Sequence, residues 1–129
     1  MSKLQELIDK YHLQRNSYYP EDFLPYRDTS PEDQKIMRER TRQLQQKYAA
    51  YIPKGWYGFL GLGAPTAITW FDVIEEYIDH LLQSSPDLEI LQVKVKFGGI
   101  RMYLGKITKE QQEELSTLTN LLHDDKLIF

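Results

Sequence analysis

Three cations and a tyrosine lie close together in a segment whose pattern predicts a β-hairpin. Residues 92–103 read QVKVKFGGIRMY, with apolar and polar side chains alternating on both sides of Gly98-Gly99. A Gly-Gly pair suits a two-residue turn that needs positive φ angles, so pairing outward from it sets Lys96 opposite Arg101 and Lys94 opposite Tyr103. Like charges directly opposite each other destabilise a sheet unless an anion or a partner surface compensates them. The sequence therefore predicts a binding surface made of Lys94, Lys96, Arg101 and Tyr103.

The opposite face of the same hairpin is apolar. With the turn at Gly98-Gly99, each pair of opposite residues on this face is apolar: Phe97 with Ile100, Val95 with Met102, and Val93 with Leu104. Side chains alternate between the two faces of a strand, so an apolar face behind a cationic one indicates a hairpin that is buried on one side. We expect the hairpin at about residues 90–104.

A glycine-rich passage at residues 53–69 offers a second place for an anion, because a helix follows it and helix N-termini present free N–H groups. Its glycines permit tight turns and close backbone approach. The passage lacks the third glycine of a dinucleotide fingerprint and the Gly-Lys-Ser/Thr element of a phosphate loop. Asp72, in the first turn of the following helix, would also repel an anion. A structural loop is the favoured interpretation, and a possible anion or ligand loop at Gly58, Gly61 and Gly63 is the alternative.

Catalytic and metal-binding patterns are weak. The carboxylates of Glu75, Glu76 and Asp79 could serve acid–base chemistry, but such residues on the polar side of an amphipathic helix usually face solvent. Glu76 and His80 have a spacing that can place two metal ligands on one helical face, yet a single pair is common by chance. The chain has no cysteine and no Gly-x-Ser-x-Gly nucleophile motif. We predict no catalytic residues, no metal and no cofactor, and the pattern favours a protein that is not an enzyme.

The composition is that of an ordinary globular domain. The 129 residues include 41% hydrophobic and 27% charged side chains, with a net charge of −3. This predicts one domain over residues 1–129, a cytoplasmic location and no membrane segment, and makes nucleic acid an unlikely partner. Charge is unevenly distributed, since residues 51–89 hold one basic and six acidic side chains whereas residues 90–104 hold three basic and none acidic. The acidic helix and the basic hairpin could therefore neutralise each other within the fold.

The remaining elements follow from hydrophobic periodicity and capping residues. Amphipathic patterns predict helices at about residues 3–13, 30–50 and 70–84, with a further helix after Thr108. Ser30, the Thr69/Asp72 pair and the Thr108/Gln111 pair are the expected N-terminal caps. An irregular aromatic and proline-rich connector is expected at about 16–29. The fold class is thus α+β, a mostly helical single domain with a β-hairpin packed on three to four helices.

Tyrosine and tryptophan are abundant, with nine and two residues respectively. Such side chains build cores and also anchor interfaces. We expect Trp56, Trp70 and Tyr77 in the core. The aromatic residues expected at the surface are Tyr18, Tyr19 and Tyr103.

The hairpin also carries a resemblance to a group of small, uncharacterised bacterial and phage proteins. In that group a Gly-Trp pair precedes a helix, and a QVKxKFGGLRFY stretch follows it. The matching residues here are Gly55-Trp56 and residues 92–103, with Val95, Ile100 and Met102 at the points of departure. Many of the similar proteins continue into a Cys-x-x-Cys pair, which this chain lacks, so no metal or redox role carries over. The resemblance implies a fold and a phage or mobile-element accessory function, and it supplies no catalytic residues.

Three functions remain open from the sequence. The leading hypothesis is a small interaction protein that uses Lys94, Lys96, Arg101 and Tyr103 to bind an acidic protein surface or a second copy of itself. The alternative is a small-ligand protein that binds a nucleotide or another anion with the hairpin cations and the glycine loop. Nucleic-acid binding would require Arg38 and Arg42 to form one basic surface with the hairpin.

Overall fold

The computed structural model describes residues 2–14, 30–63, 65 and 67–123, and within them it confirms the predicted α+β class. The helices and strands are α1 (Lys3–Tyr11), α2 (Pro31–Lys47), α3 (Thr69–Ser84), β1 (Glu89–Lys96), β2 (Gly99–Gly105) and α4 (Lys109–Leu121). Two short 3₁₀ turns, η3 (Ala49–Tyr51) and η4 (Phe59–Gly61), lie between α2 and α3. The predicted connector at 16–29, with Tyr18 and Tyr19, lies outside the described residues.

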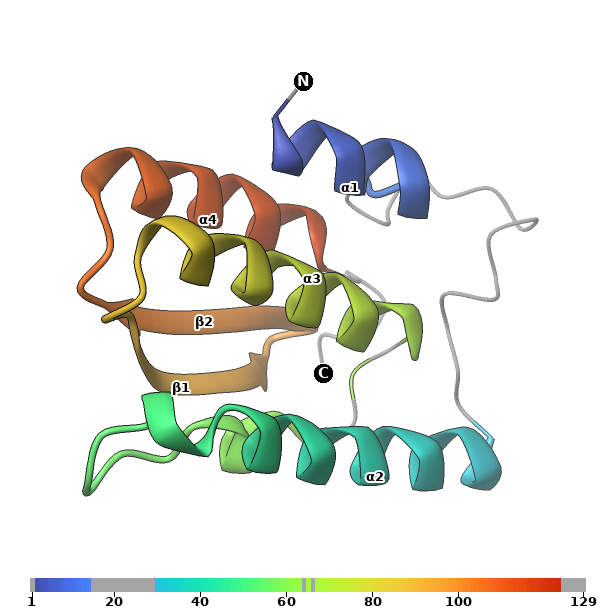
Figure 1. Ribbon diagram of the computed structural model, residues 1–129. Helices are drawn as coiled ribbons and strands as arrows, with labels where there is room; N and C mark the ends of the chain where they lie inside the picture. Colours follow the sequence, from blue (N-terminus) through green and yellow to red (C-terminus); the bar gives the residue numbers. More distant parts are fainter. Residues whose placement is uncertain (1, 15–29, 64, 66, 124–129) are drawn as a thin grey trace.

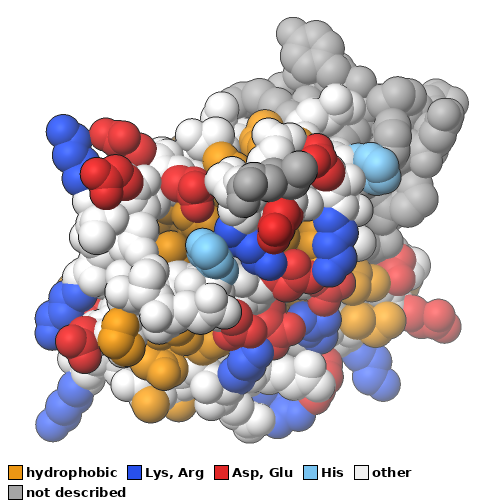
Figure 2. Space-filling model, turned by 45° about the horizontal axis from the view of Figure 1, so that its top comes forward, with side chains coloured by type: hydrophobic (Ala, Val, Ile, Leu, Met, Phe, Trp, Pro, Cys, Tyr) orange, Lys and Arg blue, Asp and Glu red, His pale blue; other side chains and the backbone are white. Residues whose placement is uncertain are grey.

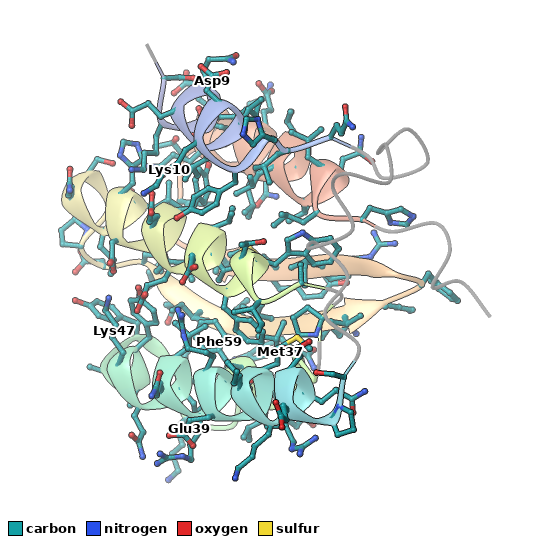
Figure 3. The ribbon with its side chains drawn as sticks, turned by 90° about the vertical axis from the view of Figure 1, so that its right-hand side faces the viewer. Asp9, Lys10, Met37, Glu39, Lys47 and Phe59 are labelled. Carbon is teal, nitrogen blue, oxygen red and sulfur yellow. The ribbon has the colours of Figure 1, made fainter. Side chains whose placement is uncertain are left out.

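The hairpin occupies the middle of the molecule. In Figure 1 it lies between α4 above and α2 below, while α3 passes in front of the strands and α1 lies at the top. Contacts join η4 to both β1 and α2, so the glycine-rich passage forms a bridge between the hairpin and the lower helix. Met37 of α2 and Phe59 of η4 lie in this region, between α2 and the strands (Figure 3).

Two of the three predicted helix caps are present. The Ser30 hydroxyl accepts a hydrogen bond from the Asp33 N–H at 3.0 Å, at the start of α2. Thr108 and Gln111 form a reciprocal capping box at the start of α4. These local motifs satisfy N–H groups that the first helical turn leaves without partners.

The predicted Thr69/Asp72 cap is wrong. The N-cap of α3 is Ile68, and no side chain caps it. Asp72 accepts instead from Arg40 of α2 at 2.8 Å, because a charged partner outcompetes a neutral backbone amide. The Thr69 hydroxyl is buried and has no hydrogen-bond partner within the described part of the chain.

The core confirms Trp70 and Tyr77 as buried residues, but Trp56 is 51% exposed, and its predicted place in the core is wrong. The reason lies in how the glycine-rich passage docks. The backbone N–H groups of Tyr57 and Gly58 both donate to the Leu91 carbonyl of β1, at 3.2 and 3.1 Å. This anchors the passage through its main chain and leaves the Trp56 side chain at the surface.

The hairpin turn differs from the prediction. Phe97 and Gly98, with φ of 53° and 77°, form the turn, and Lys96 pairs with Gly99. The predicted Gly98-Gly99 turn is therefore wrong, and Phe97 lies at the tip, 61% exposed, rather than on the apolar face. Every other side chain keeps its predicted face, because moving the turn by one residue changes each opposite partner by two positions and so preserves the alternation.

Gly99 belongs to the strand and makes a close contact with the chain at the end of α4. A Cβ atom at this position would lie 2.7 Å from Nδ1 of His123. The Ile100 N–H donates to the Leu122 carbonyl at 3.0 Å, so the chain after α4 pairs with the start of β2. A register shift between Ile90 and Gln92 is a bulge, and it places Ile90 opposite Leu104 where the sequence predicted Val93.

Candidate functional site

The acidic face of α3 is neutralised by α2. Arg40 contacts Asp72 at 2.8 Å and Glu75 at 3.3 Å. Lys47 contacts Glu75 at 3.1 Å and Asp79 at 3.0 Å. Figure 3 shows Lys47 in the space between the two helices. Three of the acidic side chains that the sequence associated with the hairpin therefore have cationic partners on a different element.

The fourth carboxylate of this helix, Glu76, is bound by α1. Lys10 and the Tyr11 hydroxyl each donate to Glu76 Oε1 at 2.6 Å, and Lys3 lies 3.6 Å from Oε2. Partial burial acts to raise the pKa of Glu76, but hydrogen bonds from Lys10 and Tyr11 hold that pKa below its usual value. Burial and the bond to Glu76 raise the pKa of the Tyr11 hydroxyl to about 12. Blue and red side chains alternate over this part of the surface in Figure 2.

The hairpin cations receive none of these carboxylates. Within the described ranges, Lys94, Lys96 and Arg101 form no ion pair. Mutual neutralisation of the acidic helix and the basic hairpin, which the sequence left open, is therefore not the arrangement that the structure shows. The positive charge of the hairpin is therefore not offset by an ion pair with any described carboxylate.

The four predicted site residues share one face of the hairpin, which we call the basic hairpin face (Lys94, Lys96, Arg101 and Tyr103). Lys94, rather than Lys96, lies directly opposite Arg101, and Tyr103 lies opposite Gln92. Two like charges thus still oppose each other. Lys94 Nζ lies 5.6 Å from the centre of the Tyr103 ring, a cation–π distance. Tyr103 is 47% exposed, which confirms its predicted place at the surface.

The glycine loop adjoins this face but has the character of a structural loop. A Cβ at Gly61 would lie 2.8 Å from Nε2 of Gln92 and 3.2 Å from Cβ of Lys94, so the loop packs closely against β1. A Cβ at Gly58 would lie 2.4 Å from Ile52. Gly63, with φ of 65°, has open space around it.

The amides of the loop are also occupied. The Gly58 N–H donates to Leu91, the Phe59 N–H to the Gln45 side chain at 2.7 Å, and the Leu60 N–H to Tyr57. An anion cradle needs several backbone N–H groups that point at the ligand. The loop therefore places β1 and α2 relative to each other, and these donors are not available to an anion.

Exposed apolar side chains extend the basic hairpin face, and the sequence reasoning missed them. Tyr57 and Leu60 flank the loop glycines and are 58% and 70% exposed, while Phe97 is exposed at the turn. The sequence contained a signal for this exposure, namely the bulky residues placed between glycines. Such side chains cannot all be buried when the loop docks through its backbone. Exposed aromatic and aliphatic groups beside cations are typical of interaction surfaces.

The other sequence candidates give no chemical site. Glu76 is held by Lys10 and Tyr11, while His80 contacts the Tyr77 ring. Over residues 2–14, 30–63, 65 and 67–123, no group of three or more His, Asp or Glu residues could hold a metal ion. In the same part of the chain no helix is both long and apolar enough to cross a membrane.

The basic surface required for nucleic-acid binding is also not formed by α2. Arg42 is paired with Glu39, with an Nε to Oε2 distance of 3.1 Å. Lys35 and Arg38 are exposed on α2 and form no ion pair with a described residue, whereas Arg40 and Lys47 of the same helix are engaged with α3. Three of the seven cations on described residues that form no ion pair with another described residue lie on the hairpin, and the other four are Lys35, Arg38, Lys54 and Lys109.

Comparison with family models, with curated proteins and with solved structures finds no match for this chain. The functional argument therefore rests on the geometry of the basic hairpin face.

Proposed function

We propose that this chain is a small non-enzymatic interaction protein whose basic hairpin face binds an acidic surface of another protein. The observation that carries the proposal is the distribution of ion pairs. The carboxylates of α3 are bound by α1 and α2, whereas Lys94, Lys96 and Arg101 have no carboxylate partner among the described residues.

The opposed pair of Lys94 and Arg101 supports this function energetically. Like charges directly opposite each other on a sheet cost on the order of 0.2–1 kcal/mol. A partner carboxylate between them would replace this repulsion with attraction, and charge complementarity would also accelerate association. Tyr103 and Phe97 add exposed ring surface, and aromatic side chains contribute strongly to binding energy at interfaces.

The test is capture of partners from a host-cell lysate by the wild-type protein and by a Lys94→Glu/Arg101→Glu variant. The matched control is Lys35→Glu/Arg38→Glu, which reverses two exposed cations on α2 and changes the net charge equally. We expect a partner that the wild type and the control retain and the hairpin variant loses. Circular dichroism and thermal melting would verify the fold of each variant.

Two results would contradict the proposal. If the hairpin and control variants lose the partner equally, the interaction depends on total charge and not on this face. If all three proteins retain the same partners, the binding surface lies elsewhere. Light scattering of the purified protein tests whether the partner is a second copy of the chain. In that case the wild type should self-associate and the hairpin variant should not.

A further inference from the structure

A polar hollow of about 510 Å³ lies between β2 and the second half of α4. One of its lining residues is Arg101, but Lys94 and Lys96 do not line it. It is therefore distinct from the centre of the basic hairpin face. The described residues around it are Gly99, Ile100, Arg101, Ser116, Thr117, Thr119, Asn120 and His123.

The fold builds this hollow by pairing the end of α4 with the start of β2. The hydrogen bond from the Ile100 N–H to the Leu122 carbonyl holds the two elements together at one end. Gly99 permits the close approach of His123, since a Cβ would lie 2.7 Å from the imidazole Nδ1. Because α4 and β2 are regular elements, the side chains that line the hollow project from fixed backbone positions.

The charges around the hollow favour an anion near β2. No carboxylate occurs among its described lining residues. Arg101 lines the hollow and forms no ion pair with any described residue, and its guanidinium would offer a ligand five donors in a fixed planar arrangement. The wall formed by α4 is different, because the C-terminal end of a helix carries partial negative charge.

The hydroxyl groups on the α4 wall act as acceptors. Ser116 donates to the Gln112 carbonyl at 3.0 Å, and Thr117 donates to the Glu113 carbonyl at 3.2 Å. Thr119 donates to the Ser116 carbonyl at 3.2 Å. Each hydroxyl proton is used within the helix, so the lone pairs of the oxygens are what remain for a ligand.

We propose that the hollow binds a small hydroxylated anion, such as a sugar phosphate or a sugar acid. The anionic group would bind Arg101, and the hydroxyl groups of the ligand would donate to the Ser116 and Thr117 oxygens. A purely anionic ligand would leave the acceptor wall unused, and a neutral sugar would leave Arg101 unused. The volume falls in the range of small-molecule sites, which is about 300–1,000 Å³.

The first experiment is isothermal titration of the full chain with ribose-5-phosphate and glucuronate, and separately with inorganic phosphate and glucose. We expect saturable binding of at least one hydroxylated anion, with at least tenfold weaker binding of phosphate alone and glucose alone. Equal affinity for inorganic phosphate and the sugar phosphate would overturn the predicted role of the α4 hydroxyls. Absence of saturable binding to both hydroxylated anions would overturn the site.

Variants test where the ligand binds and distinguish ligand binding in the hollow from protein binding by the basic hairpin face. Arg101→Gln should weaken ligand binding at least tenfold, whereas Lys94→Gln, which removes the opposed cation outside the hollow, should leave it unchanged. Thr117→Trp should block the hollow and leave capture of an acidic protein partner intact. Equal losses from Arg101→Gln and Lys94→Gln would place the ligand on the basic hairpin face and overturn the assignment to the hollow.

Discussion

At the hairpin turn, Phe97 holds a left-handed backbone conformation with φ of 53°, followed by Gly98 with φ of 77°. Two successive positive φ angles are the geometry of a type I′ turn, in which Asn-Gly is the preferred pair. A bulky L-residue in this region costs roughly 1–2 kcal/mol. The Phe97 side chain is 61% exposed, so it recovers little of that energy through burial.

Replacing Phe97 with asparagine should therefore stabilise the protein by about 1 kcal/mol, because asparagine tolerates the left-handed region better. Urea unfolding would show this as a higher midpoint with an unchanged slope. Phe97→Ala is the control, since it removes the ring without relieving the backbone. Lower stability of Phe97→Asn than of Phe97→Ala would contradict the proposed strain.

Gly99 should be intolerant of a side chain for a different reason. A Cβ there would lie 2.7 Å from His123 Nδ1 and 3.5 Å from the Leu122 carbonyl. Gly99→Ala should cost about 1–3 kcal/mol, as overpacking of a close contact does. It should also accelerate hydrogen exchange of the Ile100 amide, which donates to Leu122.

Gly105→Ala provides the control for this substitution. Gly105 lies at the other end of β2, and a Cβ there would meet its nearest atom, Glu89 Oε1, at 3.2 Å. We expect a smaller loss of stability and unchanged exchange at Ile100. Equal behaviour of the two variants would show that the contact with His123 does not hold α4 against β2.

Among the elements, α3 makes the stability of the protein depend on pH. Lys10 and Tyr11 hold the pKa of Glu76 below its usual value, although partial burial opposes them. A carboxyl with a depressed folded-state pKa contributes stability above its unfolded pKa of about 4.3, and this stability is lost as pH falls through the folded pKa. Glu76→Gln should therefore cost about 1 kcal/mol at neutral pH and much less at acid pH.

Free energies of unfolding measured between neutral and acid pH would test this expectation. The control is Glu39→Gln, which removes an exposed carboxylate that pairs only with Arg42 of its own helix among the described residues. A constant difference between wild type and Glu76→Gln at all pH values would show that the ionised carboxylate is not what stabilises the contact between α1 and α3.

The Tyr11 hydroxyl should make stability depend on pH in the alkaline range, because its folded-state pKa is raised to about 12. The stability that the protonated hydroxyl contributes should be lost as the pH rises from about 10 to about 12.

Elements that depend on local patterns could be predicted from the sequence. Ser30 and Thr108 cap α2 and α4 as expected, and alternation assigned the hairpin side chains other than Phe97 to the correct faces. The predictions failed where a distant residue intervened. Arg40 engages Asp72 in place of a cap, and Gly99 lies in the strand, where it closely approaches His123, rather than in the turn. Neither contact has a signal within its own segment.

At the scale of the whole molecule, the net charge of −3 conceals a separation of paired and unpaired charge. The sequence showed an acidic block next to a basic hairpin, and it could not show which cations each carboxylate binds. The fold assigns Arg40 and Lys47 to α3, and leaves the hairpin cations without a described carboxylate. Strand alternation thus predicted that Lys94, Lys96, Arg101 and Tyr103 share one face, whereas no sequence pattern could predict which carboxylates pair with which cations.

This separation predicts that partner binding depends strongly on salt. Exposed charges are screened over about 10 Å at 0.1 M ionic strength and about 3 Å at 1 M, so the attraction between the basic hairpin face and an acidic partner should weaken as salt rises. Because charge steering acts mainly on encounter, the association rate should fall more than the dissociation rate increases. Surface plasmon resonance with the captured partner at several salt concentrations would measure both rates.

The aromatic residues of the same surface provide the comparison. Tyr103→Ala should increase the dissociation rate and leave the salt dependence of association unchanged, because it removes contact area and no charge. Lys96→Gln should reduce the salt dependence, because it removes one of the three cations. Binding that is independent of salt but is lost in Tyr103→Ala would mean that apolar contact alone holds the partner, and that the unpaired cations serve another purpose.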